Sequence, residues 1–448
     1  MTANPLNIDK LLLGSQDPLY AAACAPWNAR IHHQPDAVVA ATSPDEVAAA
    51  VRYAADNGMR VRVQATGHGA NAACEDGLLL ATAEMRDVTI DPATGVATIG
   101  SGAKWKDVVA AAYGAGLAPP CGTSSDVGSV GFTIGGGANW FLRKYGLACD
   151  LMQGAQIVTA DGQVRWVNAE SEPDLFWALR GGGPNFGVVT ATQVQLMPHA
   201  QVYAGHFVWP VERFGDVVTA WRDWVVTTPR EVTSNAAVLH APDAPFVPEP
   251  MRGKSFVSVM VCYAGDEAAG TKLTEPLRAV EGMIQDEVGP MPFLRVDEVS
   301  QDPVDPLPHS IWATMTAGLD DATIASLTEI SPRDAQPYTV LEIRHFGDGV
   351  QPDPDRLGLA HWSGDFLIEA ISVTPTPDAY AAAAAMSDRL DVMFGPASTG
   401  MIPLNFVNSA ADVDRAFTPE HMARLLRVKS AYDPGNMFGG DKPILRTA

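Results

Sequence analysis

The sequence has little cysteine: five residues among 448, at positions 24, 74, 121, 149 and 262. None stands in a Cys-x-x-Cys pair, which argues against a disulfide scaffold and against a structural zinc site. There is likewise no His-Glu-x-x-His string, so we expect no bound metal. Scattered thiols are typical of a reducing compartment, and we therefore expect a cytoplasmic protein.

Positive charge is also scarce. The chain has 30 Lys and Arg against 52 Asp and Glu, which gives a formal net charge of −22 at pH 7. Such a field repels phosphate backbones and anionic lipids, so we expect neither a nucleic-acid nor a membrane partner. No run of ~18 apolar residues is present to cross a membrane. Residues 1–15 carry too little basic charge for a signal peptide.

Several common catalytic motifs are absent. No Gly-x-Ser-x-Gly string supplies a nucleophile elbow. No Gly-x-Gly-x-x-Gly follows a predicted strand, so a Rossmann dinucleotide fold is not supported. The Gly253-Lys254-Ser255 string resembles the end of a phosphate loop, but Pro248 occupies the position of its first glycine.

Secondary-structure signals predict two kinds of region in the 448-residue chain, whose length alone favours two or three domains. In the first third, a capping box at residues 43–46 starts a helix, and turns at 91–95 and 161–162 indicate hairpins. Beyond residue 200, strand-like runs at 256–263, 339–346 and 366–373 alternate with amphipathic helices at 213–226 and 377–393. We predict an α+β protein whose second region is a mostly antiparallel sheet covered by helices.

Three loops are unusually rich in glycine: residues 64–71, 122–137 and 180–190. Glycine permits positive φ and close backbone approach, and successive N–H groups in such turns hold anions without a basic side chain. One interpretation is that the glycines only build tight turns. The other is that they bind a pyrophosphate, which a protein of this negative charge would have to hold by its backbone.

Seven stretches of the chain follow the order and spacing of one known family. They are residues 43–58, 67–69, 116–137, 144–150, 158–162, 174–190 and 429–438. On these stretches the chain resembles the flavoprotein oxidases typified by vanillyl-alcohol oxidase, and within them the branch of berberine-bridge enzyme and the 6-hydroxynicotine oxidases. The resemblance implies a two-subdomain FAD-binding domain of the PCMH type (1–198), a substrate-binding domain (199–398) and a C-terminal return to the FAD-binding domain (399–448).

The resemblance also implies where FAD is held. In this family the histidine of the Gly-His loop, here His68, is joined to the flavin 8α-methyl. Some members add a cysteine bond to flavin C6, but Ser124 stands at that position here, so we expect one covalent link and an ordinary thiol at Cys121. The position that gates oxygen is Gly122, a small residue as in the oxidases. The cofactor-binding residues implied are Thr66, Gly67, His68, Gly69, Asn71, Gly122, Thr123, Ser124, Val127, Gly128, Gly131, Phe132, Gly135, Gly136, Gly183, Gly187, Val188, Val189 and Asn405.

A general base is expected on the strand at 366–373. Period-two alternation places Glu369 on one face with apolar neighbours, where desolvation raises a carboxyl pKa. Berberine-bridge-like enzymes carry a catalytic glutamate after a Pro-His-Arg string, of which His361-Trp362 is a degraded version. The alternative is a paired or edge-exposed carboxylate. Glu342, Arg344 and His345 on the preceding strand are second candidates.

These features together predict an FAD-dependent oxidase. It would take a hydride from a small alcohol, amine or activated C–H at flavin N5, with O₂ reoxidising the flavin to give H₂O₂, in bacterial secondary metabolism. A flavin-dependent oxidative cyclase is the alternative within enzymes. The departures at His361 and Phe406 motivate a third hypothesis, a catalytically silent flavin-binding protein, and a sugar-binding protein without flavin is a fourth.

Overall fold

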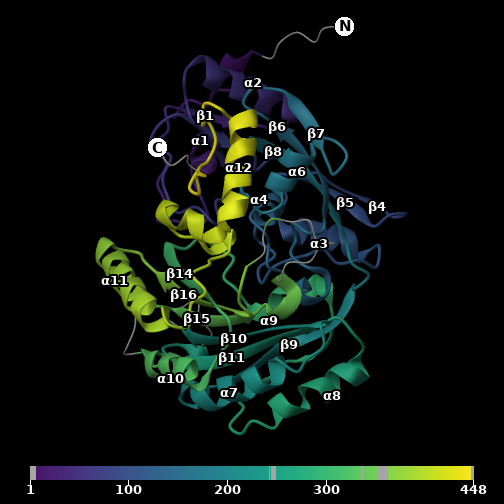
Figure 1. The fold of residues 1–448 in the computed structure, drawn as a ribbon, viewed down its shortest axis with the longest axis vertical. Helices are drawn as coiled ribbons and strands as arrows, with labels where there is room; N and C mark the ends of the chain where they lie inside the picture. Colours follow the sequence, from purple (N-terminus) through teal and green to yellow (C-terminus); the bar gives the residue numbers. More distant parts are fainter. Residues whose placement is uncertain are drawn as a thin grey trace.

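Three sheets organise the chain, and they confirm the predicted α+β class. The computed structural model describes residues 7–241, 243, 249–333, 337–350, 359 and 362–444. Figure 1 shows two of the sheets in the upper half of the molecule and the largest one below them. No helix in these described ranges is long and apolar enough to cross a membrane.

The first sheet is small and parallel, with the strand order β1-β3-β2. Parallel strands need a crossover, and α2 supplies one between β1 and β2, which lie on either side of β3. The predicted capping box starts this helix: Ser43 Oγ accepts from Glu46 N at 3.3 Å, while Glu46 Oε2 accepts from Thr42 N at 2.7 Å. The elements are α1 (Pro18–Ala23), β1 (Ala37–Ala40), α2 (Pro44–Asp56), β2 (Val61–Gln64) and β3 (Leu78–Ala81).

The second sheet is antiparallel, with the order β4-β5-β8-β6-β7. Both predicted hairpins are confirmed, since β4 pairs with β5 and β6 pairs with β7 across the expected turns. Short helices and the last two glycine-rich loops lie between its strands. The elements are β4 (Val88–Asp91), β5 (Val96–Gly100), α3 (Trp105–Tyr113), α4 (Ser129–Ile134), α5 (Leu142–Tyr145), β6 (Met152–Val158), β7 (Val164–Val167), α6 (Pro173–Leu179) and β8 (Val188–Gln195).

The third sheet has eight strands in the order β12-β9-β11-β10-β15-β16-β14, with β13 also paired to β9. All of its pairings are antiparallel, as predicted. Its strands are β9 (Gln201–Pro210), β10 (Val232–His240), β11 (Ser255–Tyr263), β12 (Gln285–Asp286), β13 (Gly289–Pro292), β14 (His309–Thr316), β15 (Val340–His345) and β16 (Phe366–Val373). Its helices are α7 (Phe214–Val225), α8 (Glu267–Arg278), α9 (Asp297–Ser300), α10 (Asp321–Ile330) and α11 (Pro377–Phe394).

The two faces of this sheet differ because side chains alternate along each strand. One face packs against helices such as α7 and α10 and contributes Leu341, Ile343 and Ile368 to an apolar core. The opposite face carries Glu342 and Glu369, which are direct partners in the β15–β16 register. The polar face is turned toward the upper half of the molecule.

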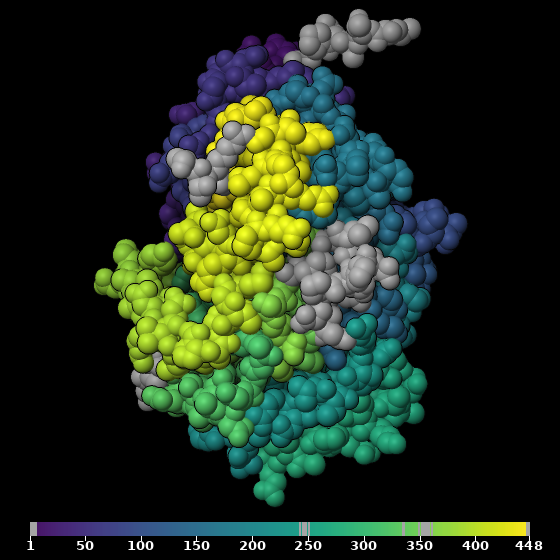
Figure 2. All heavy atoms as spheres, viewed as in Figure 1, coloured from purple at the N-terminus to yellow at the C-terminus, as the bar shows by residue number. Residues whose placement is uncertain are grey.

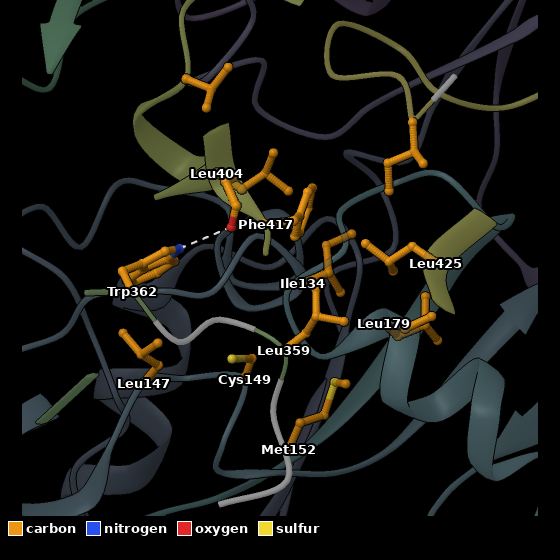
Figure 3. Packing of buried hydrophobic residues seen from close by; sticks show 14 of the residues in the cluster. Ile134, Leu147, Cys149, Met152, Leu179, Leu359, Trp362, Leu404, Phe417 and Leu425 are labelled. Atoms are coloured by element: carbon orange, nitrogen blue, oxygen red, sulfur yellow. Dashed lines mark hydrogen bonds between the residues drawn. The ribbon is translucent and has the colours of Figure 1, made fainter. Parts of the chain in front are cut away.

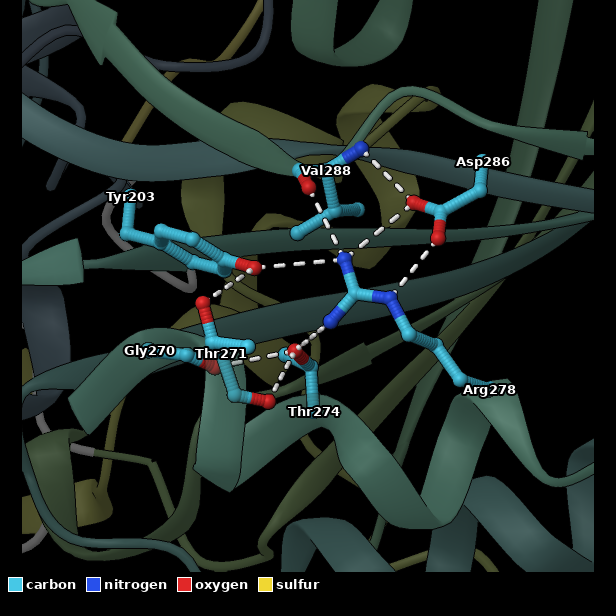
Figure 4. Close-up of polar contacts among 7 residues, drawn as sticks. All are labelled: Tyr203, Gly270, Thr271, Thr274, Arg278, Asp286 and Val288. Atoms are coloured by element: carbon cyan, nitrogen blue, oxygen red, sulfur yellow. Dashed lines mark hydrogen bonds and ion pairs between the residues drawn. The ribbon is translucent and has the colours of Figure 1, made fainter. Parts of the chain in front are cut away.

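Polar contacts also fix α8 to the outer strands of this sheet (Figure 4). Arg278 donates from Nε to Asp286 Oδ2 at 2.7 Å and from Nη2 to Tyr203 Oη at 3.2 Å and Val288 O at 2.9 Å. Hydrogen bonding lowers the pKa of Tyr203 despite its burial. The cluster serves the fold, because every partner in it is a neighbouring strand or helix.

The C-terminal region returns to the upper half of the molecule. Figure 2 shows this yellow segment lying across the front surface, over both the blue and the green parts of the chain. Its elements are η7 (Leu404–Phe406), η8 (Ala410–Ala416) and α12 (Pro419–Tyr432). In Figure 3, Leu404, Phe417 and Leu425 pack with Ile134 and Leu179 in one core. The predicted domain limits fall in the connections β8–β9 and α11–η7, and they stay a prediction.

A buried lysine anchors α12 to the third glycine-rich loop. Lys429 is 4% exposed, and its ammonium donates to Asn185 O, Phe438 O and Asp433 Oδ2 at 2.6–2.7 Å. Asp433 is itself 1% exposed. The lysine therefore neutralises a buried carboxylate and satisfies two carbonyls at once.

We expect Lys429→Met to lower the free energy of unfolding by about 3–5 kcal/mol, because it leaves a buried carboxylate without its cation. Urea denaturation followed by circular dichroism would measure this. Lys272→Met is the matched control, since Lys272 is exposed on α8. If Lys429→Met lowers the free energy of unfolding no more than the control does, water replaces the ammonium group beside Asp433.

Candidate functional site

The first glycine-rich loop leaves β2 in a fixed direction. Gln64, at the end of the strand, is buried, and it bonds His33 Nε2 at 2.8 Å and Ala23 O at 2.9 Å. Gly67 then has φ +66°, and a Cβ on it would lie 2.4 Å from Pro26 Cβ. Only glycine fits there. These constraints set the position of the next residue, His68.

His68 is a neutral imidazole in a partly buried position. Trp27 stacks on it with a ring-centroid distance of 4.1 Å and an interplanar angle of 29°. Burial, together with the charges of His309 and Lys104, lowers the pKa of His68 to about 4. Its Nδ1 atom is buried and has no hydrogen-bond partner within the part of the chain that the structure describes. An unprotonated nitrogen is available for a ligand.

The N-terminal segment locks this loop to the large sheet. Asn28 donates to Ala70 O at 2.8 Å and to His309 O at 3.2 Å, and its Oδ1 accepts from His309 N at 3.2 Å. His309 begins β14, 281 residues further along the chain. Sequence reasoning missed Trp27 and Asn28, because no local pattern marks a contact over that separation.

The second loop is held by Asn405, which the sequence predicted near the flavin. Asn405 Oδ1 accepts from Gly137 N at 2.8 Å, and its Nδ2 lies 3.4 Å from Phe132 O. A Cβ on Gly135 would come within 2.4 Å of Asn405 Nδ2. The asparagine therefore shapes the loop's backbone, and it does so by direct contact.

The start of the second loop is fixed by α9. Ser125 donates from Oγ to Asp297 at 2.5 Å, and Ser300 Oγ donates to Thr123 O at 2.7 Å. Ser124 and Cys121 are both buried. Burial raises the pKa of the Cys121 thiol well above its usual value. A thiol that stays protonated supports the expectation of an ordinary loop cysteine there.

The third loop joins α6 to β8. Gly183 has φ +70°, and Gly187 has φ +154° with a would-be Cβ 2.4 Å from Val158 O. A side chain at Gly187 would strike β6. Val188 and Val189 follow as the first, buried residues of β8.

These loops fit an extended anionic cofactor such as FAD. Gly69 and Gly131 are exposed, and a Cβ on either would meet no atom within 4 Å, so bare backbone faces open space on two of the loops. A cavity of about 640 Å³ borders Thr66 and Trp27, within the size range of small-molecule sites. Among the described residues, no cluster of three or more His, Cys, Asp or Glu is arranged to hold a metal ion.

Glu369 is a paired carboxylate, the alternative that the sequence left open. It is 1% exposed, and Arg344 Nε donates to its Oε1 at 2.5 Å. The apolar neighbours predicted for Glu369 do lie on its face of the sheet. On the paired strand β15, however, the residue diagonally across from Glu369 is Arg344. Sequence periodicity along β16 does not show which strand pairs with it, and that pairing brings the cation.

Glu342 keeps one oxygen free of partners. Its Oε2 accepts from Arg344 Nη2 at 3.1 Å, whereas its buried Oε1 has no hydrogen-bond partner in the described ranges. Burial raises the pKa of Glu342 to about 8; Arg344 opposes this, and the charges of Glu369 and Asp302 and a hydrogen bond with Glu369 add to it. Burial and the neighbouring carboxylates therefore favour the protonated form of Glu342.

The carboxylates and the glycine-rich loops meet at η7. The guanidinium carbon of Arg344 lies 5.4 Å from the ring centroid of Phe406, which follows the loop-holding Asn405 directly. The structure thus brings together Glu342, Glu369 and the second loop. It places His345 elsewhere: this residue alternates to the helix-covered face, with its ring 4.9 Å from Phe366. His361 lies outside the described residues.

Comparisons with known proteins agree with this arrangement. Residues 35–168 match a family model described as FAD binding domain. The chain is 30% identical to (R)-6-hydroxynicotine oxidase of Paenarthrobacter nicotinovorans, over 97% of this chain and 96% of that protein. The crystal structure of 6-hydroxy-D-nicotine oxidase from Arthrobacter nicotinovorans superimposes with a TM-score of 0.86 at 27% identity, covering both chains fully. Glucooligosaccharide oxidase from Acremonium strictum, which carries 6-S-cysteinyl, 8α-N1-histidyl FAD, shares the fold (TM-score 0.83, 18% identity, 98% of each chain).

We expect Gly67→Ala to lower the free energy of unfolding by about 2–4 kcal/mol, from backbone strain at positive φ and overlap with Pro26. Gly69→Ala is the matched control two residues away, because its Cβ enters open space. Thermal and urea unfolding of the two variants give the comparison. Equal stability of both would contradict the assigned geometry of the loop.

Proposed function

Since the chain belongs to the FAD-linked oxidases of the vanillyl-alcohol oxidase superfamily, we propose that it oxidises a small organic molecule with molecular oxygen as electron acceptor. The substrate class is an alcohol, an amine or an activated C–H compound. Bound FAD would supply the redox chemistry, taking a hydride from the substrate and yielding H₂O₂ on reaction with O₂. The chain's own residues hold the cofactor, orient the substrate and move its proton.

The observation that carries this proposal is the meeting of two neutral, buried groups with the glycine-rich loops. His68 stands on the first loop with an unpartnered nitrogen, and Glu342 Oε1 lies on the polar face of the large sheet. Asn405 and Phe406 connect the second loop to that face. A cofactor between the loops therefore has a carboxyl group on its substrate side.

We propose Glu342, rather than Glu369, as the general base. Arg344 occupies Oε1 of Glu369 at 2.5 Å, and this charge-assisted bond leaves that oxygen unavailable to a substrate proton. Glu342 has an oxygen without a partner and a pKa of about 8, close to the value that suits a base at physiological pH. Arg344 and Glu369 then act as positioning residues that hold Glu342 on its face.

We propose further that His68 forms the single covalent bond to FAD, as the sequence predicted. A neutral imidazole keeps a lone pair on one ring nitrogen, Nδ1 of His68 has no hydrogen-bond partner among the described residues, and Trp27 stacks on the ring. The relative from Acremonium strictum, whose name states an 8α-N1-histidyl FAD, shows that this fold accommodates such a bond. Ser124 stands at the position where some members of the family carry the cysteine, so no thiolate is present there for a second covalent bond.

After acid precipitation, the flavin of the wild type should stay bound in the protein pellet. In His68→Ala it should be released into the supernatant. The measurement is the absorption spectrum of pellet and supernatant after acid precipitation. His421→Ala is the control, because His421 lies on α12 with its ring against Trp177, at 5.9 Å between centroids, and it does not line the cavity. Flavin released from the wild type as well would refute the covalent bond while leaving the FAD site in place.

Glu342→Gln should slow anaerobic flavin reduction by about 10²–10⁴-fold, the usual contribution of a general base. Stopped-flow absorbance with 6-hydroxynicotine and a panel of alcohols and amines identifies a reducing substrate. In the wild type the rate should rise with pH through about 8, as Glu342 loses its proton, and the variant should lack this rise. Glu267→Gln, an exposed position on α8, should change nothing. A pH-dependent rise that survives in Glu342→Gln would exclude Glu342 as the base.

Glu369→Gln should move the pH-dependent rise in the rate of flavin reduction to lower pH. Removing the negative charge of Glu369 takes away one cause of the raised pKa of Glu342 and leaves Arg344 to Glu342 alone. The pH profile of flavin reduction measures the shift. A rise that stays at pH 8 would show that the two carboxyls titrate independently.

A further inference from the structure

The last described residues contact the first and third glycine-rich loops directly and reach the second through Asn405. The segment Asp441–Ile444, here called the C-terminal clasp, lies at the upper part of the molecule near α1 and β1, where the C-terminus is marked in Figure 1. It follows α12 without forming a helix or strand. Sequence analysis gave these residues no role.

The clasp reaches the first loop through Asp441. Its Oδ2 accepts from the backbone N of Asn71 at 2.9 Å, and its other oxygen pairs with Arg62 on β2. The aspartate thus ties the end of the loop that carries His68 to the strand from which the loop departs. The pairing with Arg62 also neutralises a carboxylate that would otherwise stand beside an anion site.

The clasp reaches the second loop through Lys442. Its Nζ donates to Leu404 O at 2.7 Å and lies 3.3 Å from Asn405 O. The side chain of Asn405 in turn accepts from Gly137 N at 2.8 Å. Lys442 therefore fixes the backbone of the residue whose side chain shapes the loop. Burial lowers the pKa of Lys442 to about 8.

The clasp reaches the third loop through Asn185, which is 0% exposed. Asn185 Nδ2 donates to Lys442 O at 3.1 Å and to Gly182 O at 2.9 Å, and its Oδ1 accepts from Ile444 N at 2.9 Å. Every polar atom of this side chain is engaged. The loop and the clasp are thus bonded reciprocally.

We propose that Asp441 and Lys442 are positioning residues for FAD, which act by holding the three glycine-rich loops in one arrangement before the cofactor binds. The inference rests on the FAD site proposed above. Glycine-rich backbone loses more conformational freedom on ordering than any other. Bonds that order the loops in advance therefore remove part of the entropic cost of cofactor binding.

The test measures FAD affinity in the His68→Ala background, where binding is reversible. FAD is titrated into the apoprotein and flavin fluorescence is followed. Asp441→Ala and Lys442→Met should each raise the Kd about tenfold, the loss expected for one charge-assisted hydrogen bond. Lys442→Arg, which keeps a cationic donor, should recover most of the affinity. Lys272→Met on α8 is the matched control.

Unchanged Kd values, within twofold of the parent, in folded Asp441→Ala and Lys442→Met would overturn the proposal. A merely structural role would lower the melting temperature of the apoprotein and leave the Kd of the folded protein unchanged, which also counts against it. Should Lys442→Met fail to fold, Asp441→Asn, which removes only the charge, gives the same comparison. A parent that binds no FAD would refute the FAD site itself, and since no substrate is present, the result is independent of the proposed oxidation.

Discussion

The substrate side of this protein depends on one buried cation. Arg344 donates to carboxylates on its own strand and on the neighbouring one, so that three ionisable groups share a face of the large sheet. Removing the cation would leave buried carboxyl oxygens on two strands without their donor, a cost of several kcal/mol. Arg344 also stacks over Phe406, which joins the two glutamates to η7 and so to Asn405, the residue that holds the second glycine-rich loop.

A chain of net charge −22 that binds FAD has to hold the cofactor's pyrophosphate without a basic surface. Gly69 and Gly131 leave open space where a side chain would stand, so an anion can approach the backbone closely, and peptide N–H groups can bind it without adding net charge. Lys104 and Lys106 share the single carboxylate of Asp126 at 2.7–2.8 Å, and this group of three carries one net positive charge beside the cavity. The local environment is therefore less negative than the overall charge suggests.

Local features of the fold could be predicted from the sequence, and features that join distant segments could not. The capping box at Ser43, both hairpins and the strands β11, β15 and β16 depend on neighbours within a few residues, and all of them are confirmed. The three glycine-rich loops were recognisable for the same reason. The stacking of Trp27 on His68 and the pairing of Arg344 with Glu369 depend on which strands and loops meet in space. No periodicity in a single stretch contains that information.

His68 and Glu342, the two groups that we propose for the site, are both kept neutral by burial, which acts here on opposite charges. Burial lowers the pKa of His68 to about 4 and raises that of Glu342 to about 8, because a low-dielectric surrounding disfavours the imidazolium and the carboxylate alike. At pH 7 both can therefore face a bound cofactor without adding charge. Arg344 pairs with Glu369 beside it and also donates to Glu342. The site can thus accept or release a proton at Glu342 while Arg344 supplies a compensating positive charge next to it.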